Sequence, residues 1–160
     1  MKKDPAELIE AARQAGLHLG VDISSRVSGE RRLLKLSVLR RIVEAGLAAL
    51  PPESPYARVI ADVLTWSHDH PDDWIRVWEL VEETWNRREP CSQGALDPFN
   101  IDAKINGAYV ALGLLYGDGD FAETTKIATR AGQDSDCNPA TAAGILGVVL
   151  GYEGIPNEYS

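Results

Sequence analysis

The 160-residue sequence lacks several features that would assign it to a class of protein at once. Its two cysteines, Cys91 and Cys137, are too few for a disulfide framework and fit a reducing compartment. No apolar run reaches the ~18 residues of a membrane span, and no apolar stretch follows the basic N-terminus as in a signal peptide. Basic residues are also few, with 16 Lys and Arg against 24 Asp and Glu, which disfavours nucleic-acid binding through bulk charge. We therefore expect a cytoplasmic protein without a membrane or nucleic-acid partner.

The composition itself is that of a globular domain. Hydrophobic residues make up 44% of the chain and charged residues 25%. A chain of this length corresponds to about one domain and buries roughly 70% of the surface that its unfolded form exposes. We expect one compact, multi-helix, all-α domain over residues 1–160, with a weakly ordered N-terminal segment at residues 1–30.

Apolar residues recur at helical spacing along most of the chain, and Gly and Pro residues mark the ends of these segments. No strand-like alternation persists for more than a few residues. Four tryptophans at helical spacing, Trp66, Trp74, Trp78 and Trp85, favour core or interface positions. The pattern predicts helices that run from Pro5 to Gly16, from Leu36 to Leu50, from Pro55 to His68, from Asp72 or Asp73 to Trp85, from Ile101 to Tyr116, from Phe121 to Ala131 and from Pro139 to Tyr152.

Small residues dominate two of these predicted helices, 101–116 and 139–152. A glycine inside a helix costs ~1 kcal/mol relative to alanine, so repeated glycines need a compensating reason. The usual reason is the close approach of two packed helix backbones. We expect these helices to bury each other or a neighbour.

The stretch GQDSDCNPATAAGILG, which starts at Gly132, carries the candidate chemistry. Asp134 and Asp136 are one residue apart in a predicted extended loop, so both carboxylates can reach one cation from the same side. Asn138 as N-cap and Pro139 in the first turn then predict a helix whose N-terminus favours negative charge. Oxygen ligands of this kind suit Mg²⁺ or Ca²⁺ rather than zinc. The alternative is that both acids only cap and solvate the turn.

From Asn100 to Pro156 the chain resembles the C-terminal part of the ADP-ribosylglycohydrolase family, which includes dinitrogenase-reductase-activating glycohydrolases and the related jellyfish crystallins. The family motif is Gly-Gly-Asp-Thr-Asp-Thr followed by a small-residue helix, and residues 132–137 read GQDSDC here. The resemblance implies that Asp134 and Asp136 are ligands of a binuclear Mg²⁺ centre, or Mn²⁺ in some members. Cys137 replaces the last threonine and is a weak third ligand, because a thiol suits a hard cation less well than a hydroxyl. Residues 100–156 thus form the metal-motif region.

The resemblance also implies that part of the site is missing. In the family the other metal ligands come from an N-terminal Thr/Ser-Asp-Asp motif, and an N-terminal acid assists catalysis. No such motif precedes Asn100, since Asp72 and Asp73 follow a proline. We therefore expect the C-terminal portion of a hydrolase that cleaves the glycosidic bond to ADP-ribose, with its catalytic acid outside this chain. It would be inactive alone and would self-associate or bind a complementary N-terminal half.

Two other functions remain open at this stage. The chain could be a non-catalytic structural or binding protein that keeps the fold, as the crystallin relatives suggest. It could also be a helical fragment whose exposed Gly/Ala helices require a partner. An unpartnered small-residue helix predicts exposed apolar surface.

Overall fold

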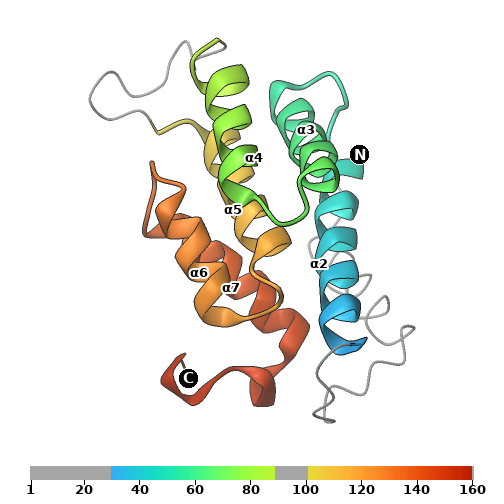
Figure 1. The fold of residues 1–160 in the computed structure, drawn as a ribbon, viewed down its shortest axis with the longest axis vertical. Coiled ribbons are helices and arrows are strands. Elements are labelled where there is room, and N and C mark those ends of the chain that lie inside the picture. Colours follow the sequence, from blue (N-terminus) through green and yellow to red (C-terminus); the bar gives the residue numbers. More distant parts are fainter. Residues whose placement is uncertain (1–29, 89–100, 160) are drawn as a thin grey trace.

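The computed structural model describes residues 30–88 and 101–159, and these residues form helices and turns without any strand (Figure 1). The all-α class is therefore confirmed. None of the described helices is both long and apolar enough to cross a lipid bilayer. The described helices are α2 (Glu30–Ala48), α3 (Pro55–Asp69), α4 (Trp74–Val81), the π-helix η1 (Glu82–Asn86), α5 (Ala103–Tyr116), α6 (Phe121–Arg130) and α7 (Cys137–Leu150), followed by the 3-10 turns η2 (Tyr152–Gly154) and η3 (Asn157–Tyr159).

Some predictions fall on residues that the structure does not describe. The predicted helix at 5–16 lies outside the described residues, as does most of the predicted weakly ordered segment at 1–30; only Glu30 is described, and it begins α2. The single domain over residues 1–160 stays a prediction for the same reason.

Local sequence signals explain where the helices begin. The Ser54 hydroxyl accepts a hydrogen bond from the Ala57 N–H (3.1 Å), and a proline occupies the first turn of α3. The carboxylates of Asp73 and Asp120 cap α4 and α6 by accepting from N–H groups three residues later. These helix starts confirm the predicted ones. Helix α5 begins two residues later than predicted, because Asp102 is its N-cap.

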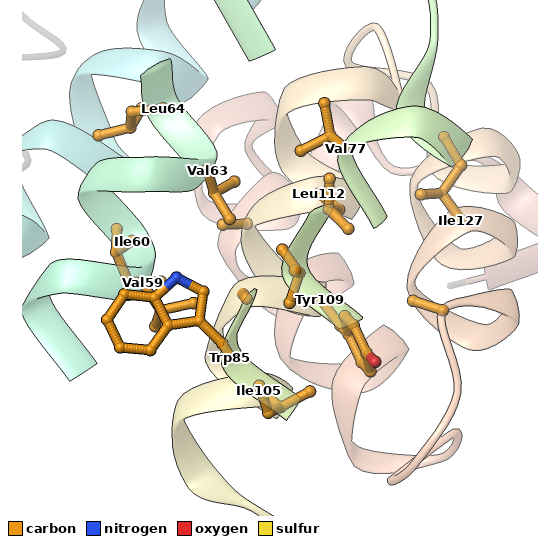
Figure 2. Close-up of a cluster of buried hydrophobic side chains, with 14 residues drawn as sticks. Val59, Ile60, Val63, Leu64, Val77, Trp85, Ile105, Tyr109, Leu112 and Ile127 are labelled. Atoms are coloured by element: carbon orange, nitrogen blue, oxygen red, sulfur yellow. The ribbon is translucent and has the colours of Figure 1, made fainter. Parts of the chain in front are cut away.

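Helix α5 runs through the middle of the molecule and contacts α2, α3, α4, α6 and α7 (Figure 1). Figure 2 shows the larger core cluster, in which α3, α4, η1, α5 and α6 all bury apolar side chains. Trp85 is buried there, and Trp66, Trp74 and Trp78 are half-buried against the same cluster, so the predicted core role of the tryptophans is confirmed. The labelled members are Val59, Ile60, Val63, Leu64, Val77, Trp85, Ile105, Tyr109, Leu112 and Ile127.

A second core cluster fixes α7 to the rest of the protein. It joins α2 and α5 to α6 and α7, and one stripe of α7, four residues apart, supplies three of its members. The opposite side of α7 faces outward: Val148 is 80% exposed, and Tyr152 just after the helix is 83% exposed. The buried members are Leu39, Leu114, Phe121, Ala128, Ala142, Leu146 and Leu150.

Candidate functional site

The candidate site is the turn between α6 and α7, which differs from the predicted extended loop. Gly132 (φ 103°) and Gln133 (φ 51°) both adopt left-handed backbone conformations, and residues 134–136 then form a tight turn. The backbone reverses within a few residues because Gly132 tolerates positive φ. This compact turn brings the acids to the N-terminus of α7.

The N-cap of α7 is Asp136, so the predicted capping role of Asn138 is wrong. The Asp136 carboxylate accepts a hydrogen bond from the Cys137 N–H (3.0 Å). Asn138 instead lies in the first turn of the helix with its side chain buried. Its amide nitrogen donates to the Asn106 side-chain oxygen (2.7 Å) and to the Gly132 carbonyl (3.4 Å), so this side chain serves tertiary contact rather than capping.

The structure brings together the three residues that the motif predicted. Carboxylate oxygens of Asp134 and Asp136 and the Sγ of Cys137 all lie within 4.8 Å of one another. Asp134 is half-buried, whereas the other two side chains are exposed. Asp134 Oδ1 also accepts from the Cys137 N–H (3.3 Å), so the two acids share this one backbone N–H and each uses a single carboxylate oxygen for it. The alternative that both acids cap the turn is therefore partly true. Capping uses one oxygen of each carboxylate, and the other oxygen remains for a ligand.

Electrostatics couple these three side chains. Two hydrogen bonds hold the pKa of Asp136 below its usual value. The larger effect comes from the Asp134 carboxyl group and the smaller from the Cys137 N–H. The same Asp134 carboxylate, by hydrogen bonding and charge, raises the pKa of the Cys137 thiol. Among the described residues, no Lys, Arg or His lies within salt-bridge distance of either acid. The turn is thus a concentrated negative site whose thiol stays protonated.

Sequence reasoning missed the polar side chains behind this turn. Asn106, from α5, accepts hydrogen bonds at Oδ1 from the Asp134 N–H (3.2 Å) and from Asn138. Its amide nitrogen donates to the Asp102 carbonyl (3.0 Å) and to Gln133 Oε1 (3.2 Å). The available signal was an asparagine inside each of two helices otherwise rich in small apolar residues, α5 and α7.

Asp102 and Lys104 form a buried ion pair beside this network. Asp102 caps α5 by accepting from the Lys104 N–H (2.9 Å), and its other oxygen pairs with the Lys104 ammonium. The Asp102 N–H donates to Gln133 Oε1 (3.1 Å), so the start of α5 is tied directly to the turn. Because Lys104 neutralises Asp102, this third acid is not free to act as a metal ligand.

The donor set fits a hard divalent cation only in part. Two carboxylates held close together without a cationic neighbour suit Mg²⁺ or Mn²⁺, whereas the protonated thiol of Cys137 is a poor ligand for either ion. Mg²⁺ requires six oxygen ligands in near-octahedral geometry. In the part of the chain that the structure describes, no other cluster of three His, Cys, Asp or Glu side chains has this geometry. Any ion here needs further ligands from water, substrate or another segment.

Comparison with known protein families gave a match. A family model described as ADP-ribosylglycohydrolase matches residues 4–160, which is nearly the whole chain. The match therefore includes residues 4–99, ahead of the region in which the motif lies. Comparison with curated proteins and with solved structures returned no significant match.

Proposed function

The chain belongs to the ADP-ribosylglycohydrolase family, and from this premise we propose that it contributes the C-terminal metal ligands of a hydrolase. The reaction would be cleavage of the glycosidic bond of ADP-ribosylated substrates at a binuclear Mg²⁺ centre, with Mn²⁺ as the alternative ion. The observation that carries this proposal is the convergence of Asp134 and Asp136 oxygens at the N-terminus of α7. The dipole of this helix N-terminus favours negative charge, which supports the presence of two carboxylates there.

Each residue of the turn has a distinct role in this proposal. Asp134 and Asp136 supply one carboxylate oxygen or more to the ions. Ions held there would supply Lewis-acid chemistry, which would orient the ribose hydroxyls and lower the pKa of a water that attacks the anomeric carbon and displaces the linked group. Cys137 contributes little, because its raised pKa keeps the thiol protonated where the family motif has a hydroxyl.

A complementary chain that brings the remaining ligands completes the proposal. Helix α7 carries the two acids at its N-terminus and an open apolar groove of about 560 Å³ along its C-terminal half. One partner lying along α7 would therefore reach both features. The groove is lined by Phe121, Ala143, Gly144, Gly147, Val148, Gly151, Tyr152, Ile155 and Tyr159.

Titration with Mn²⁺, followed by electron paramagnetic resonance, tests the ligand assignment. The wild-type chain should bind the ion with millimolar or tighter affinity, and Asp134→Ala should abolish this binding. Asp69→Ala, which removes an exposed acid at the end of α3, is the matched control and should bind as wild type does. Equal binding by wild type and Asp134→Ala, or none by wild type, contradicts the assignment.

Light scattering with co-expression tests the partner. We expect a 1:1 complex between this chain and the N-terminal half of a full-length family member, with metal-dependent hydrolysis in the complex alone. Val148→Asp, which puts a charge in the groove, should prevent the complex. A homodimer that Val148→Asp dissociates would show that the groove binds a second copy instead, and a chain that forms neither complex contradicts the proposal.

A non-catalytic structural protein is the second candidate, and Cys137 is the observation that favours it. Its thiol stands at a position where the family motif has a metal-binding hydroxyl, so the ligand set is weakened. Either function is compatible with the cytoplasm, which we propose because Cys137 is an exposed free thiol that an oxidising compartment would modify.

A further inference from the structure

We propose that Asn106 and Gln133 act together as a latch that positions the two acids, an inference that rests on the proposed metal-binding function. Both are positioning residues, since they act on the backbone of the turn rather than on a ligand. The structure that carries this inference is the set of hydrogen bonds that joins α5, the turn and the first turn of α7.

Asn106 uses its whole hydrogen-bonding capacity in this network. An asparagine amide has two donor hydrogens and an oxygen with two acceptor sites. Asn106 Nδ2 donates to the Asp102 carbonyl and to Gln133 Oε1, while Oδ1 accepts from the Asp134 N–H and Asn138 Nδ2. The two groups that donate to Oδ1 lie on either side of residues 135–137. One side chain of α5 therefore holds both ends of the turn that carries the acids.

Gln133 adopts an energetically unfavourable conformation, which indicates that its side chain makes compensating contacts. Its φ of 51° is in the left-handed region, where a glycine would be unstrained. Its Nε2 is buried without a hydrogen-bond partner among the described residues, which is also unfavourable. In return, Oε1 accepts from both the Asp102 N–H (3.1 Å) and Asn106 Nδ2 (3.2 Å). These bonds fix the residue directly before Asp134 to the N-terminus of α5.

The latch explains how an exposed turn can hold two carboxylates together without a cationic neighbour. When both carboxyl groups are ionised they repel each other, and an unrestrained turn would then let the side chains separate. Anchors at Gln133, Asp134 and Asn138 leave the backbone between them little freedom. A turn already fixed in this way needs less ordering when an ion binds, which strengthens binding.

Three variants separate the latch from simple folding. Asn106→Asp keeps the shape of the side chain but removes both donors and places an oxygen against two acceptors. Gln133→Asn keeps an amide that tolerates positive φ but is one methylene too short to reach Asp102. Gln133→Gly removes the strain together with the latch. Asn157→Asp, the same chemical change at an exposed residue of η3, is the control.

The readouts are Mn²⁺ affinity by electron paramagnetic resonance, the hydrogen-exchange rate of the Asp134 amide by NMR, and the thermal melt. We expect Asn106→Asp and Gln133→Asn to weaken Mn²⁺ binding by about 10–100-fold, the usual cost of losing a group that orients a ligand. The Asp134 amide should exchange at least about tenfold faster, since its acceptor moves. Asn157→Asp should change neither. Gln133→Gly should lose affinity while its melting temperature holds or rises, a combination that a purely structural role does not produce.

The outcomes for the latch and for the metal site can be told apart. Unchanged amide exchange and unchanged Mn²⁺ affinity in Asn106→Asp and Gln133→Asn would overturn the latch, even where wild type binds the ion. If wild type binds no Mn²⁺, the proposed function fails, and exchange at Asp134 still decides whether the latch holds the turn. If Asn106→Asp does not fold, Gln133→Asn and Gln133→Gly carry the test.

Discussion

Helices α5 and α7 have similar lengths and small-residue compositions but different surroundings. Both span 14 residues, both are rich in glycine and alanine, and both begin at an aspartate cap. Eight residues of α5 are buried, whereas only four residues of α7 are. A small-residue pattern therefore identifies a helix that can be packed on all sides, and the rest of the protein decides whether it is.

The glycines of the two helices show the same difference. A Cβ on Gly113 of α5 would lie 2.9 Å from the Thr124 carbonyl oxygen of α6, so the expected close approach of helix backbones is confirmed there. A Cβ on Gly144 of α7 would meet no atom within 4 Å. The close-approach explanation thus holds for α5 and not for the outer face of α7.

The acids at the two N-termini differ as well. Asp102 of α5 is 3% exposed and paired with Lys104, so its charge is used within the fold. Asp134 and Asp136 at α7 have no such partner among the described residues and remain accessible. The acid at the start of α5 is thus used within the fold, whereas those at the start of α7 form no ion pair with any described residue.

The largest expected effect is on the buried ion pair of α5. Asp102→Asn leaves the Lys104 ammonium buried without its counter-charge, and breaking such a pair costs about 3–5 kcal/mol. Urea denaturation should show this loss in the free energy of unfolding. Asp136→Asn, at the exposed cap of α7, should shift the midpoint far less. Similar losses in both variants would contradict the distinction between the two N-termini.

Replacing a glycine by alanine should change the stability of the fold by an intermediate amount, with opposite sign in the two helices. Gly113→Ala pushes a methyl group against the backbone of α6 and should destabilise the fold by about 1–3 kcal/mol. Gly144→Ala should stabilise it by up to about 1 kcal/mol, because alanine favours the helix and has open space. Thermal melts measured at several protein concentrations test both. A destabilised Gly144→Ala monomer would show that the outer face of α7 is packed after all.

The smallest effect concerns the thiol at the start of α7. Because Asp134 raises the pKa of Cys137, less thiolate is present at a given pH, and alkylation near pH 8 should be slow for an exposed cysteine. The rate should rise with pH along a curve displaced to higher pH than that of a free thiol. Measurements with iodoacetamide in a Cys91→Ser background isolate this group.

Asp134→Asn provides the comparison for that rate. Removing the charge should move the alkylation profile to lower pH and increase the rate several-fold near pH 8. Added Mg²⁺ should act in the same direction on the wild-type chain, since a cation stabilises the thiolate. An identical profile in wild type and Asp134→Asn would contradict the coupling between the two side chains.

Features that depend on neighbouring residues were predictable from the sequence. The caps at Ser54, Asp73 and Asp120 and the helices that follow them rest on contacts three residues long. The closeness of Asp134 and Asp136 likewise follows from their spacing. Such signals lie within a few consecutive residues, so they can be recognised without knowledge of the tertiary fold.

Features that depend on distant residues were not predictable. Asn106 meets Asn138, 32 positions later, and this contact draws Asn138 into the protein and leaves Asp136 to cap α7. Gln133 adopts positive φ where its side chain can reach the N-terminus of α5. These contacts cannot be predicted from a single sequence, because side chains far apart in the chain meet only after the helices have packed.

The uncharged outer face of α7 has a consequence for how the protein behaves in solution. The chain carries a net charge of −8, but no Asp, Glu, Lys or Arg lies between Cys137 and Leu150. At low ionic strength, electrostatic repulsion between copies therefore opposes self-association through this face. Salt screens the repulsion, because the Debye length falls from about 10 Å at 0.1 M to about 3 Å at 1 M. Colloidal stability should accordingly decline on adding salt, and Gly144, Val148 and Tyr152 are the residues at which copies would first adhere.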